Sequence, residues 1–261
     1  MTKSKDEFRH VYGDPTVLGT KLDVHARYSR KPTDIPRAIA TRCGAPSDLE
    51  ILDIGCGTGH LIEYLSGHGH WGRLVGLDLV RPPIADTAAK QYVVGDAEAV
   101  PFPDNSFDVI TCVHTLSHID DLAAAMREAR RVLRPGGMFI ASANSLTSYP
   151  HVDRYRRRVH RIFGWGEPTF TTTTVNAENL GQVLASFWHV ATVETLAGEL
   201  RIPVQKFTPY FAANIPTWDV IPTDAQYGDI LQWVAGWSVD DQESGYLTEP
   251  KKIALAICSE P

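Results

Sequence analysis

The sequence predicts an α/β protein, with a mostly parallel sheet that carries helices on both faces. Apolar runs of strand length recur in the first half of the chain, at 50–54, 73–78, 91–94 and 107–113. A segment near 122–133 shows helical spacing of its apolar residues. The first run ends in three alternating glycines, as a strand–turn–helix unit does. Strands that alternate with helices are typical of a parallel sheet.

The composition fits one domain of this class with additions. The chain has 261 residues, of which 43% are hydrophobic, so it can bury a full core. Its formal net charge is -6, which argues against a nucleic-acid partner and favours a small substrate.

The spacing of the cysteines and the polar first residues are typical of a cytoplasmic protein. Four cysteines lie far apart and form no C-x-x-C pair, so the sequence predicts neither a zinc site nor a disulfide framework. The first residues lack the apolar core of a signal peptide, and no apolar run is long enough to span a bilayer. We therefore expect a soluble protein of the cytoplasm with no membrane partner.

The glycine-rich turn is suited to contact with a ligand. Gly55, Gly57 and Gly59 have no side chains, so a ligand can lie against the backbone at the positive end of the following helix. A dinucleotide fingerprint requires its third glycine one residue later, where this chain has His60. The spacing therefore disfavours a nicotinamide enzyme.

Together with Asp53, the segment 52–59 resembles the first motif of the class I S-adenosylmethionine-dependent methyltransferases. Further segments resemble that family's motifs and follow in its order, at 75–78, 94–97, 101–108 and 133–137. The resemblance covers about residues 45 to 145. It points to the group that methylates small molecules, similar to the methyltransferases of quinone biosynthesis.

The resemblance implies a Rossmann-like sheet of seven strands, mostly parallel, with an antiparallel last strand at 253–258, and it implies S-adenosyl-L-methionine as the cofactor. Asp78 follows Gly59 by 19 residues, the kind of separation that a strand–helix–strand unit gives to an acid that binds a ribose diol. The family's motifs assign these residues to the cofactor: Asp53, Gly55, Gly57, Gly59, Asp78, Leu79, Asp96, Ala97 and His114.

Two local details are also predicted. Pro82 and Pro83 stand where the family starts its next helix, so that helix must be short or displaced. Asp120 is expected to cap the helix that contains Leu122 and Met126.

We expect one methyltransferase domain over residues 1–261. Its parts are an N-terminal arm, a cofactor-binding core, two cap insertions and the last strand, at 1–44, 45–145, 146–175, 203–248 and 253–258. The insertion 203–248 is rich in aromatic residues, which suit a hydrophobic acceptor pocket, a homodimer contact or the packing of added helices.

Two groups of side chains are candidates for the acceptor site. Tyr12 and Tyr28 lie in the arm, and either face the acceptor pocket or pack the arm onto the core. Arg154 and Arg158 share a helical face, and form either a recess for an anionic substrate group or a solvated surface.

His114 and His118 are the candidate catalytic residues. Both follow the strand 107–113, and ligands of open α/β sheets gather at the carboxyl ends of strands. Either ring can take the proton of a hydroxyl acceptor, because histidine titrates near neutrality. His118 has a structural alternative, in which it braces the following helix. No metal is expected, because no second histidine shares the face of His60 and Glu63.

We expect the chain to methylate a hydroxyl or an amine of a small organic molecule in natural-product metabolism. The protein then mainly aligns donor and acceptor, because the sulfonium already supplies the leaving group. Two alternatives remain open: methylation of RNA or protein, and a protein that binds S-adenosylmethionine without methylating, such as a cyclase.

Overall fold

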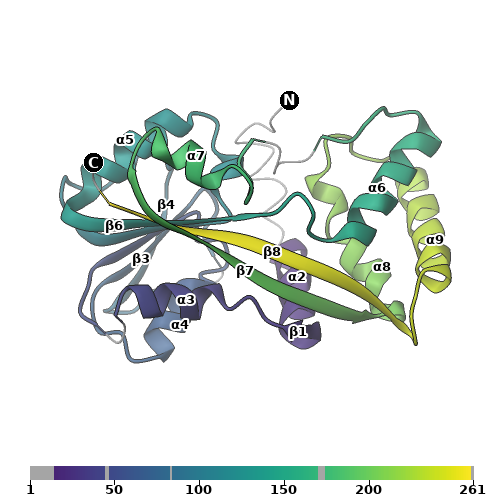
Figure 1. The fold of residues 1–261 in the computed structure, drawn as a ribbon, viewed down its shortest axis with the longest axis horizontal. Coiled ribbons are helices and arrows are strands. Elements are labelled where there is room, and N and C mark those ends of the chain that lie inside the picture. Colours follow the sequence, from purple (N-terminus) through teal and green to yellow (C-terminus); the bar gives the residue numbers. More distant parts are fainter. Residues whose placement is uncertain (1–14, 45–46, 83, 170–173, 260–261) are drawn as a thin grey trace.

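The computed structural model describes residues 15–44, 47–82, 84–169 and 174–259. In these ranges the strands form one sheet in the order β1-β7-β8-β6-β5-β2-β3-β4 (Figure 1). Their bounds are β1 Ser29–Lys31, β2 Ile51–Ile54, β3 Leu74–Asp78, β4 Lys90–Val94, β5 Phe107–Val113, β6 Leu133–Asn144, β7 His189–Pro203 and β8 Tyr246–Ser259. The helices are α2 Pro15–Tyr28, α3 Ile35–Arg42, α4 His60–Gly67, α5 Leu122–Val132, α6 Pro150–Phe163, α7 Leu180–Ala185, α8 Val204–Ala212 and α9 Asp224–Asp240, with the 3-10 turns η1 Leu116–His118 and η3 Ile215–Thr217.

The expected mixed sheet is confirmed, with one addition. β4, β3, β2, β5 and β6 pair in parallel, while β8 pairs antiparallel with both β6 and β7. The expectation of seven strands missed β1, which has three residues and pairs antiparallel with β7. Its sequence Ser-Arg-Lys has no apolar residue, so hydrophobic periodicity gave no signal for a strand there.

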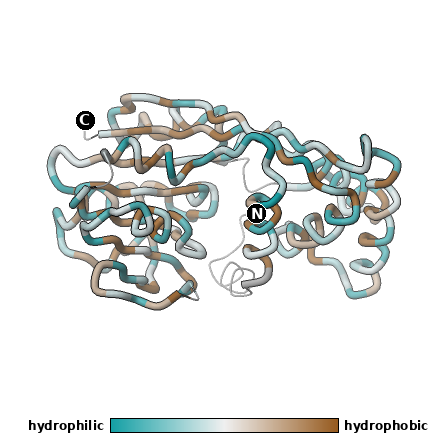
Figure 2. Tube along the Cα trace, turned by 90° about the horizontal axis from the view of Figure 1, so that it is seen from below, coloured by the Kyte–Doolittle hydropathy of each residue, from teal (hydrophilic) through white to brown (hydrophobic). Residues whose placement is uncertain are grey.

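Helices cover both faces of the sheet because its strands are apolar on both sides. Successive side chains of a strand point to opposite faces. Leu52 packs into the cluster that includes α5 and α7, whereas Ile51 packs into the cluster that includes α3 and α4. Figure 1 shows the two helix pairs on opposite sides of the sheet. Hydrophobic segments of the strands appear brown in Figure 2, as expected for a sheet that is buried on both faces.

The β7–β8 pair extends beyond the rest of the sheet and carries a second group of helices. β6 pairs with β8 as far as Asn144 and Ile253, whereas β7 and β8 stay paired to Pro203 and Tyr246. α6, α8 and α9 pack around this extension (Figure 1). The last strand is therefore longer than the expected 253–258, because its pairing with β7 continues past the end of β6.

The aromatic residues of the second insertion mostly pack this group of helices. Phe207, Phe211 and Trp218 are buried in one hydrophobic cluster with residues of α6 and α9. The hydroxyl of Tyr155 on α6 donates to the carbonyl of Trp237 on α9 at 2.9 Å. Packing of added helices therefore accounts for most of these rings, and Tyr210 is the member that also lines the cavity described below.

Two local predictions differ from the structure. The N-cap of α5 is Asp121 and not Asp120, because the Asp121 carboxylate accepts from the Ala124 amide at 2.9 Å. The residues described between β3 and β4 form no helix. Polar bonds hold this segment instead, since Arg81 donates to the Tyr92 carbonyl at 2.6 Å and pairs with Asp86 at 2.8 Å.

The described ranges contain no helix that is long and apolar enough to cross a bilayer. The cysteines Cys43, Cys56, Cys112 and Cys258 are all buried and free. Among the same residues, no group of three or more His, Cys, Asp or Glu side chains is arranged to hold a metal ion.

Candidate active site

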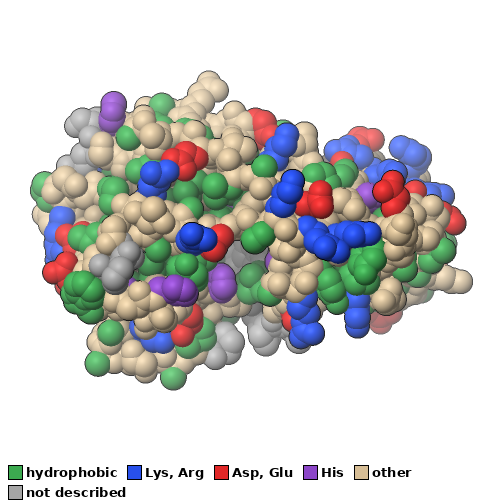
Figure 3. Space-filling model, turned by 60° about the horizontal axis from the view of Figure 1, so that its bottom comes forward, with side chains coloured by type: hydrophobic (Ala, Val, Ile, Leu, Met, Phe, Trp, Pro, Cys, Tyr) green, Lys and Arg blue, Asp and Glu red, His purple; other side chains and the backbone are tan. Residues whose placement is uncertain are grey.

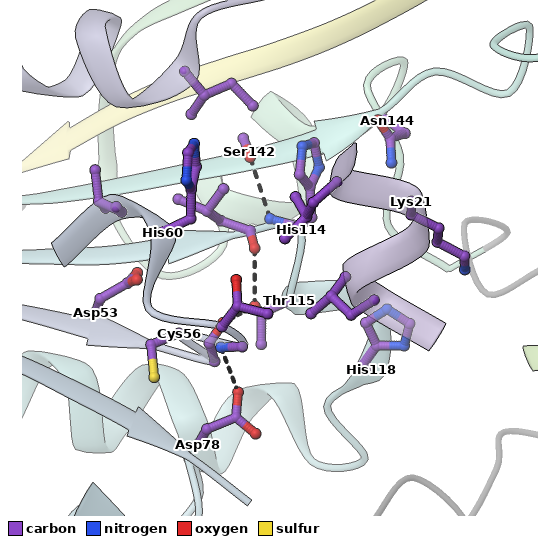
Figure 4. Close-up of a pocket in the computed structure, with 18 of the residues that line it drawn as sticks. Lys21, Asp53, Cys56, His60, Asp78, His114, Thr115, His118, Ser142 and Asn144 are labelled. Carbon is purple, nitrogen blue, oxygen red and sulfur yellow. Dashed lines mark hydrogen bonds between the residues drawn. The ribbon is translucent and has the colours of Figure 1, made fainter. Parts of the chain in front are cut away.

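A cavity of about 1000 Å³ lies at the carboxyl ends of the parallel strands. The glycine turn after β2 lines it, together with residues that follow β3, β4 and β5 and with helix α2 of the N-terminal arm. Figure 4 shows side chains converging on this cavity from the strand ends and from α2. Its volume is at the upper end of the range for small-molecule sites, so it has room for two small ligands side by side.

The glycine turn requires glycine for its backbone and for space. Gly55, Gly57 and Gly59 have φ angles of 71°, 54° and 74°, in the left-handed region that other residues avoid. A Cβ on Gly55 would lie 2.2 Å from the Thr115 methyl carbon. A Cβ on Gly59 would lie 2.8 Å from the Tyr92 ring. The turn therefore exposes its backbone to a ligand in the cavity, while Thr115 and Tyr92 pack closely against its glycines.

Asp78 ends β3 and is held rigidly at the cavity wall. Its Oδ2 accepts from the Gly57 amide at 2.8 Å and its Oδ1 accepts from the Val80 amide at 3.0 Å. Burial raises the pKa of Asp78, and the backbone donors oppose that rise. A carboxylate has about four acceptor sites, so both oxygens keep capacity for a further donor. This geometry suits a pair of vicinal hydroxyls.

Asp53 is buried below the turn, with 2% of its surface exposed. It lies opposite Thr111 in the β2–β5 pairing and accepts from the Thr111 hydroxyl at 2.7 Å. The pKa of Asp53 is raised to about 7, mainly by burial; the Thr111 bond opposes this rise and the charge of Asp78 adds to it. A cation in the cavity would favour the ionised form of this group.

Asp96, Ala97 and Leu79 complete this side of the cavity. The Asp96 carboxylate accepts from the Glu98 amide at 3.0 Å, which fixes the loop after β4. Leu79 and Ala97 add apolar surface beside that carboxylate. A flat heterocycle with an exocyclic donor fits between such groups.

The structure brings the predicted cofactor residues together. All of them line the cavity except Gly59. This residue is the last glycine of the turn and lies close to the Tyr92 ring. Bare backbone, a two-oxygen acceptor at Asp78, and an apolar surface with an acceptor at Asp96 are the groups that an adenosyl cofactor needs. The residues of this cavity therefore fit S-adenosylmethionine.

Both candidate catalytic histidines line the cavity (Figure 4). His114 follows β5 with a positive φ of 56°, and its amide donates to the Ser142 carbonyl at 3.1 Å. A non-glycine residue in this conformation costs roughly 1 to 3 kcal/mol, a strain that is concentrated at functional sites. Burial lowers the pKa of His114 to about 3 and that of His118 to about 4, and nearby positive groups add to both effects. Both rings are therefore neutral at neutral pH.

The predicted substrate residues are placed elsewhere. Tyr12 lies outside the described residues. Tyr28 packs, partly buried, against the hydrophobic cluster of α6, α8 and α9. Arg154 pairs with Asp241 at 2.5 Å, and the Arg158 guanidinium lies 4.1 Å from the Trp237 ring centre. Tyr28, Arg154 and Arg158 are absent from the cavity lining.

Two of the basic residues of α6, Arg154 and Arg158, therefore belong to a surface. Their helix packs on α9, where Arg154 contacts the C-cap residue Asp241 and Arg158 contacts Trp237, and neither arginine lines the cavity. Figure 3 shows Lys and Arg side chains interspersed with Asp and Glu over this lobe. These contacts with Asp241 and Trp237 are those of the solvated-surface interpretation of Arg154 and Arg158.

Several cavity residues were not predicted. Lys21 and His25 come from α2, Tyr149 and Tyr210 from the cap, and Lys251 from β8. The spacing of Lys21 and His25, four residues apart, was a signal for a shared helical face. No comparable signal marks Lys251, because it precedes the apolar run that identified the last strand.

The comparisons with known proteins agree with this geometry. A family model described as a methyltransferase domain matches residues 52–141. Demethylmenaquinone methyltransferase of Staphylococcus saprophyticus subsp. saprophyticus is 31% identical over 182 residues, which cover 64% of this chain and 77% of that protein. Four other curated relatives are matched over 41, 47, 59 and 61% of their length, so the chain spans about half of each.

Solved structures show the same fold. A putative type II methyltransferase from Anaeromyxobacter dehalogenans superposes with a TM-score of 0.61 at 23% identity, covering 88% of this chain and 96% of that one. A [4+2]-cyclase superposes with a TM-score of 0.63 at 17% identity, covering 100% of this chain and 98% of that one. At these identities the likeness concerns the fold alone.

Proposed function

This chain belongs to the class I S-adenosylmethionine-dependent methyltransferase family, and we propose that it transfers a methyl group from S-adenosylmethionine to a small organic acceptor. The observation that carries the proposal is the convergence of motif residues from four separate strand ends on one cavity. Asp53 lies in β2 next to its last residue, Asp78 ends β3, Asp96 and His114 follow β4 and β5, and all four line the cavity.

Each cofactor residue has a role in this proposal. Asp78 accepts from the two ribose hydroxyls, Asp96 and Ala97 meet the adenine edge, and Leu79 packs on its face. The glycine turn approaches the amino-acid part of the cofactor. Asp53, which has one hydrogen bond from Thr111, provides negative charge below that part.

The bound cofactor supplies a methyl group on a sulfonium, and transfer forms the acceptor–carbon bond while the carbon–sulfur electron pair returns to sulfur. The protein's residues hold the acceptor in line and receive its proton. We assign proton acceptance from a hydroxyl acceptor to His114 or His118, because both are neutral cavity residues. An amine acceptor reacts through its lone pair and loses its proton afterwards.

The cavity favours a small acceptor over RNA or protein. Its walls come from the strand ends on one side, and from α2, Tyr149 and Tyr210 on the other. These elements leave about 1000 Å³ for donor and acceptor together. The Staphylococcus relative is named for demethylmenaquinone, so a quinol-like ring is one acceptor within this proposal, and a natural-product intermediate is another.

Two measurements test the proposed function. Calorimetry should show binding of S-adenosylmethionine and of its demethylated product, with NADH as the control nucleotide. Incubation with a metabolite extract and a donor carrying a deuterated methyl group should then yield a labelled small molecule by mass spectrometry. If the protein binds NADH but not S-adenosylmethionine, the cofactor assignment is refuted. Cofactor binding without any labelled product, across extracts and purified quinols, would favour a protein that does not methylate.

A further inference from the structure

The cavity carries a cluster of basic side chains that the cofactor residues do not explain. Lys21 and His25 project from α2, His114 and His118 follow β5, and Lys251 comes from β8. Figure 4 shows Lys21, His114 and His118 around the same space. The cluster joins three elements that are far apart in the sequence.

The two lysines of this cluster have no anionic partner among the residues that the structure describes. Within the part of the chain that the structure describes, neither ammonium group forms a hydrogen bond or an ion pair. Both side chains are partly buried, and burial lowers the pKa of each lysine to about 8. Arg81, another cation of the cavity wall, is by contrast bonded to Tyr92 and Asp86. Burial of an unpaired cation is costly, so an arrangement of this kind is typical of a site that receives an anion.

None of the described acids that line the cavity forms an ion pair with either lysine, and each of them accepts a hydrogen bond from another group. The acceptor and donor pairs are Asp23 with Arg27, Asp34 with the Arg37 amide, Asp53 with Thr111, Asp78 with the Gly57 amide, Asp96 with the Glu98 amide, and Glu98 with the Asp121 amide. Glu249 lies two residues before Lys251 on β8. Its oxygens accept from the His151 and Val152 amides at 3.2 and 3.1 Å, at the start of α6.

Strand register explains why Lys251 faces the cavity. Ile253 lies on the face of β8 that α3 and α4 cover, and alternation puts Lys251 on that same face. β6 stops pairing at Ile253, so the position of Lys251 lies just past the end of β6, where the cavity begins. Lys252 points to the opposite face and is exposed. A substitution at Lys252 is therefore a suitable control for the same substitution at Lys251.

The two lysines lie toward different parts of the cavity. The charge of Lys251 acts on His25 and His114, whereas that of Lys21 acts on His25 and His118. On α2, Leu18 lies one turn before Lys21 and would be 3.2 Å from a Cβ on Gly57. Lys21 therefore comes from the helix that contacts the glycine turn, whereas Lys251 comes from β8, just past the end of β6.

We propose that Lys251 binds a carboxylate of the methyl acceptor, so that the substrate class of this site is a small organic acid. The inference rests on the proposed function, because it places the acceptor beside His114. S-adenosylmethionine itself carries one carboxylate, and in this proposal Lys21, on the helix that contacts the glycine turn, binds that group. Lys251 is then left for a second anion. Tyr149 and Tyr210 lie with their ring centres 5.8 and 6.2 Å from His25, which gives the same space aromatic walls.

The test uses the full chain saturated with S-adenosylhomocysteine, with benzoate and its neutral isostere benzamide as probes. Calorimetric titration should show that benzoate binds at least about tenfold more tightly than benzamide, as expected for one charge-assisted hydrogen bond. Lys251→Met should weaken benzoate binding by about tenfold to a hundredfold. Lys251→Arg should retain part of that affinity, and the matched control Lys252→Met should retain all of it.

The readouts separate this inference from the proposed function. In Lys251→Met the affinity for S-adenosylhomocysteine should stay within about twofold of the wild type, whereas Lys21→Met should lose it. Equal binding of benzoate and benzamide overturns the inference, and so does a parallel loss of cofactor and benzoate in Lys251→Met. Tighter binding of phenyl phosphate than of benzoate would also refute a carboxylate. If the wild type binds no S-adenosylhomocysteine, the proposed function itself fails.

Discussion

The Gly57 amide donates to the Asp78 carboxylate over 2.8 Å, which ties the glycine turn after β2 to the end of β3. The bond joins two of the motifs that the sequence predicted separately. It also orients the Asp78 oxygens before any ligand enters, which reduces the entropy lost on binding.

Asp78→Ala should therefore weaken the binding of S-adenosylhomocysteine by at least the roughly 1.5 kcal/mol of a charged hydrogen bond. Part of the loss will come from the Gly57 amide, which loses its acceptor. Calorimetry measures the effect, and Asp240→Ala, at an exposed position of α9, is the control. Wild-type affinity in Asp78→Ala would show that another group binds the ribose.

Gly55→Ala should destabilise the fold more than Gly136→Ala. Both glycines have positive φ angles, of 71° and 78°, but a Cβ on Gly136 would meet no atom within 4 Å. The backbone term of roughly 1 to 2 kcal/mol is common to both, so the difference between them reports the clash with Thr115. Overpacking of this kind typically costs about 1 to 3 kcal/mol. Urea unfolding of both variants gives the comparison, and equal losses would mean that Thr115 moves aside freely.

The sequence predicted the cofactor half of the cavity because strand ends and glycine turns are local signals. Asp53 lies near the end of an apolar run, Asp78 ends one and Asp96 follows one, and the parallel sheet then places all three at one edge. The acceptor half could not be derived in this way. Lys251 reaches the cavity only because β8 continues past the end of β6, and Lys21 only because α2 folds over the turn.

The prediction for Arg154 and Arg158 also shows that a local sequence pattern does not reveal tertiary contacts. Helical spacing placed them on one face of α6, which is a local property. Which partner that face meets is a tertiary property, and it is α9 rather than the cavity that lies there.

Asp219→Ala should destabilise the cap strongly. The Asp219 carboxylate accepts from the Arg156 guanidinium at 2.6 Å and from the Thr169 amide at 2.8 Å, and the Arg156 side chain is only 7% exposed. Removal of one partner leaves a buried charge, at a cost of about 3 to 5 kcal/mol. The exposed pair of Arg157 with Asp153 is the control, where Asp153→Ala should cost about 0.5 kcal/mol or less. Thermal unfolding would contradict the prediction if the two variants lose equal stability.

Asp53 should make the stability of the ligand-free protein depend on pH. Its pKa is about 7 in the folded chain because of burial, against about 4 for an unfolded aspartate. The folded state therefore binds more protons over that interval, and the free energy of unfolding should fall as pH rises from about 4 to about 7. Urea titrations across this range measure the slope, and Asp53→Asn should flatten it. An unchanged slope in Asp53→Asn would assign the pH dependence to other groups.

His114→Ala should lower kcat for a hydroxyl acceptor by about 10² to 10⁴ while cofactor affinity is retained, if this ring takes the proton. Because burial and nearby positive groups lower the pKa of His114 to about 3, the ring stays neutral well below neutrality. The wild-type rate should therefore show no loss from histidine protonation between about pH 8 and pH 5, in contrast to an exposed histidine with a pKa near 6.5. His118→Ala, measured in parallel, decides between the two rings, and His189→Ala at an exposed position is the control. Near-full activity in both His114→Ala and His118→Ala would leave catalysis to the alignment of donor and acceptor, since the sulfonium needs no acid to leave.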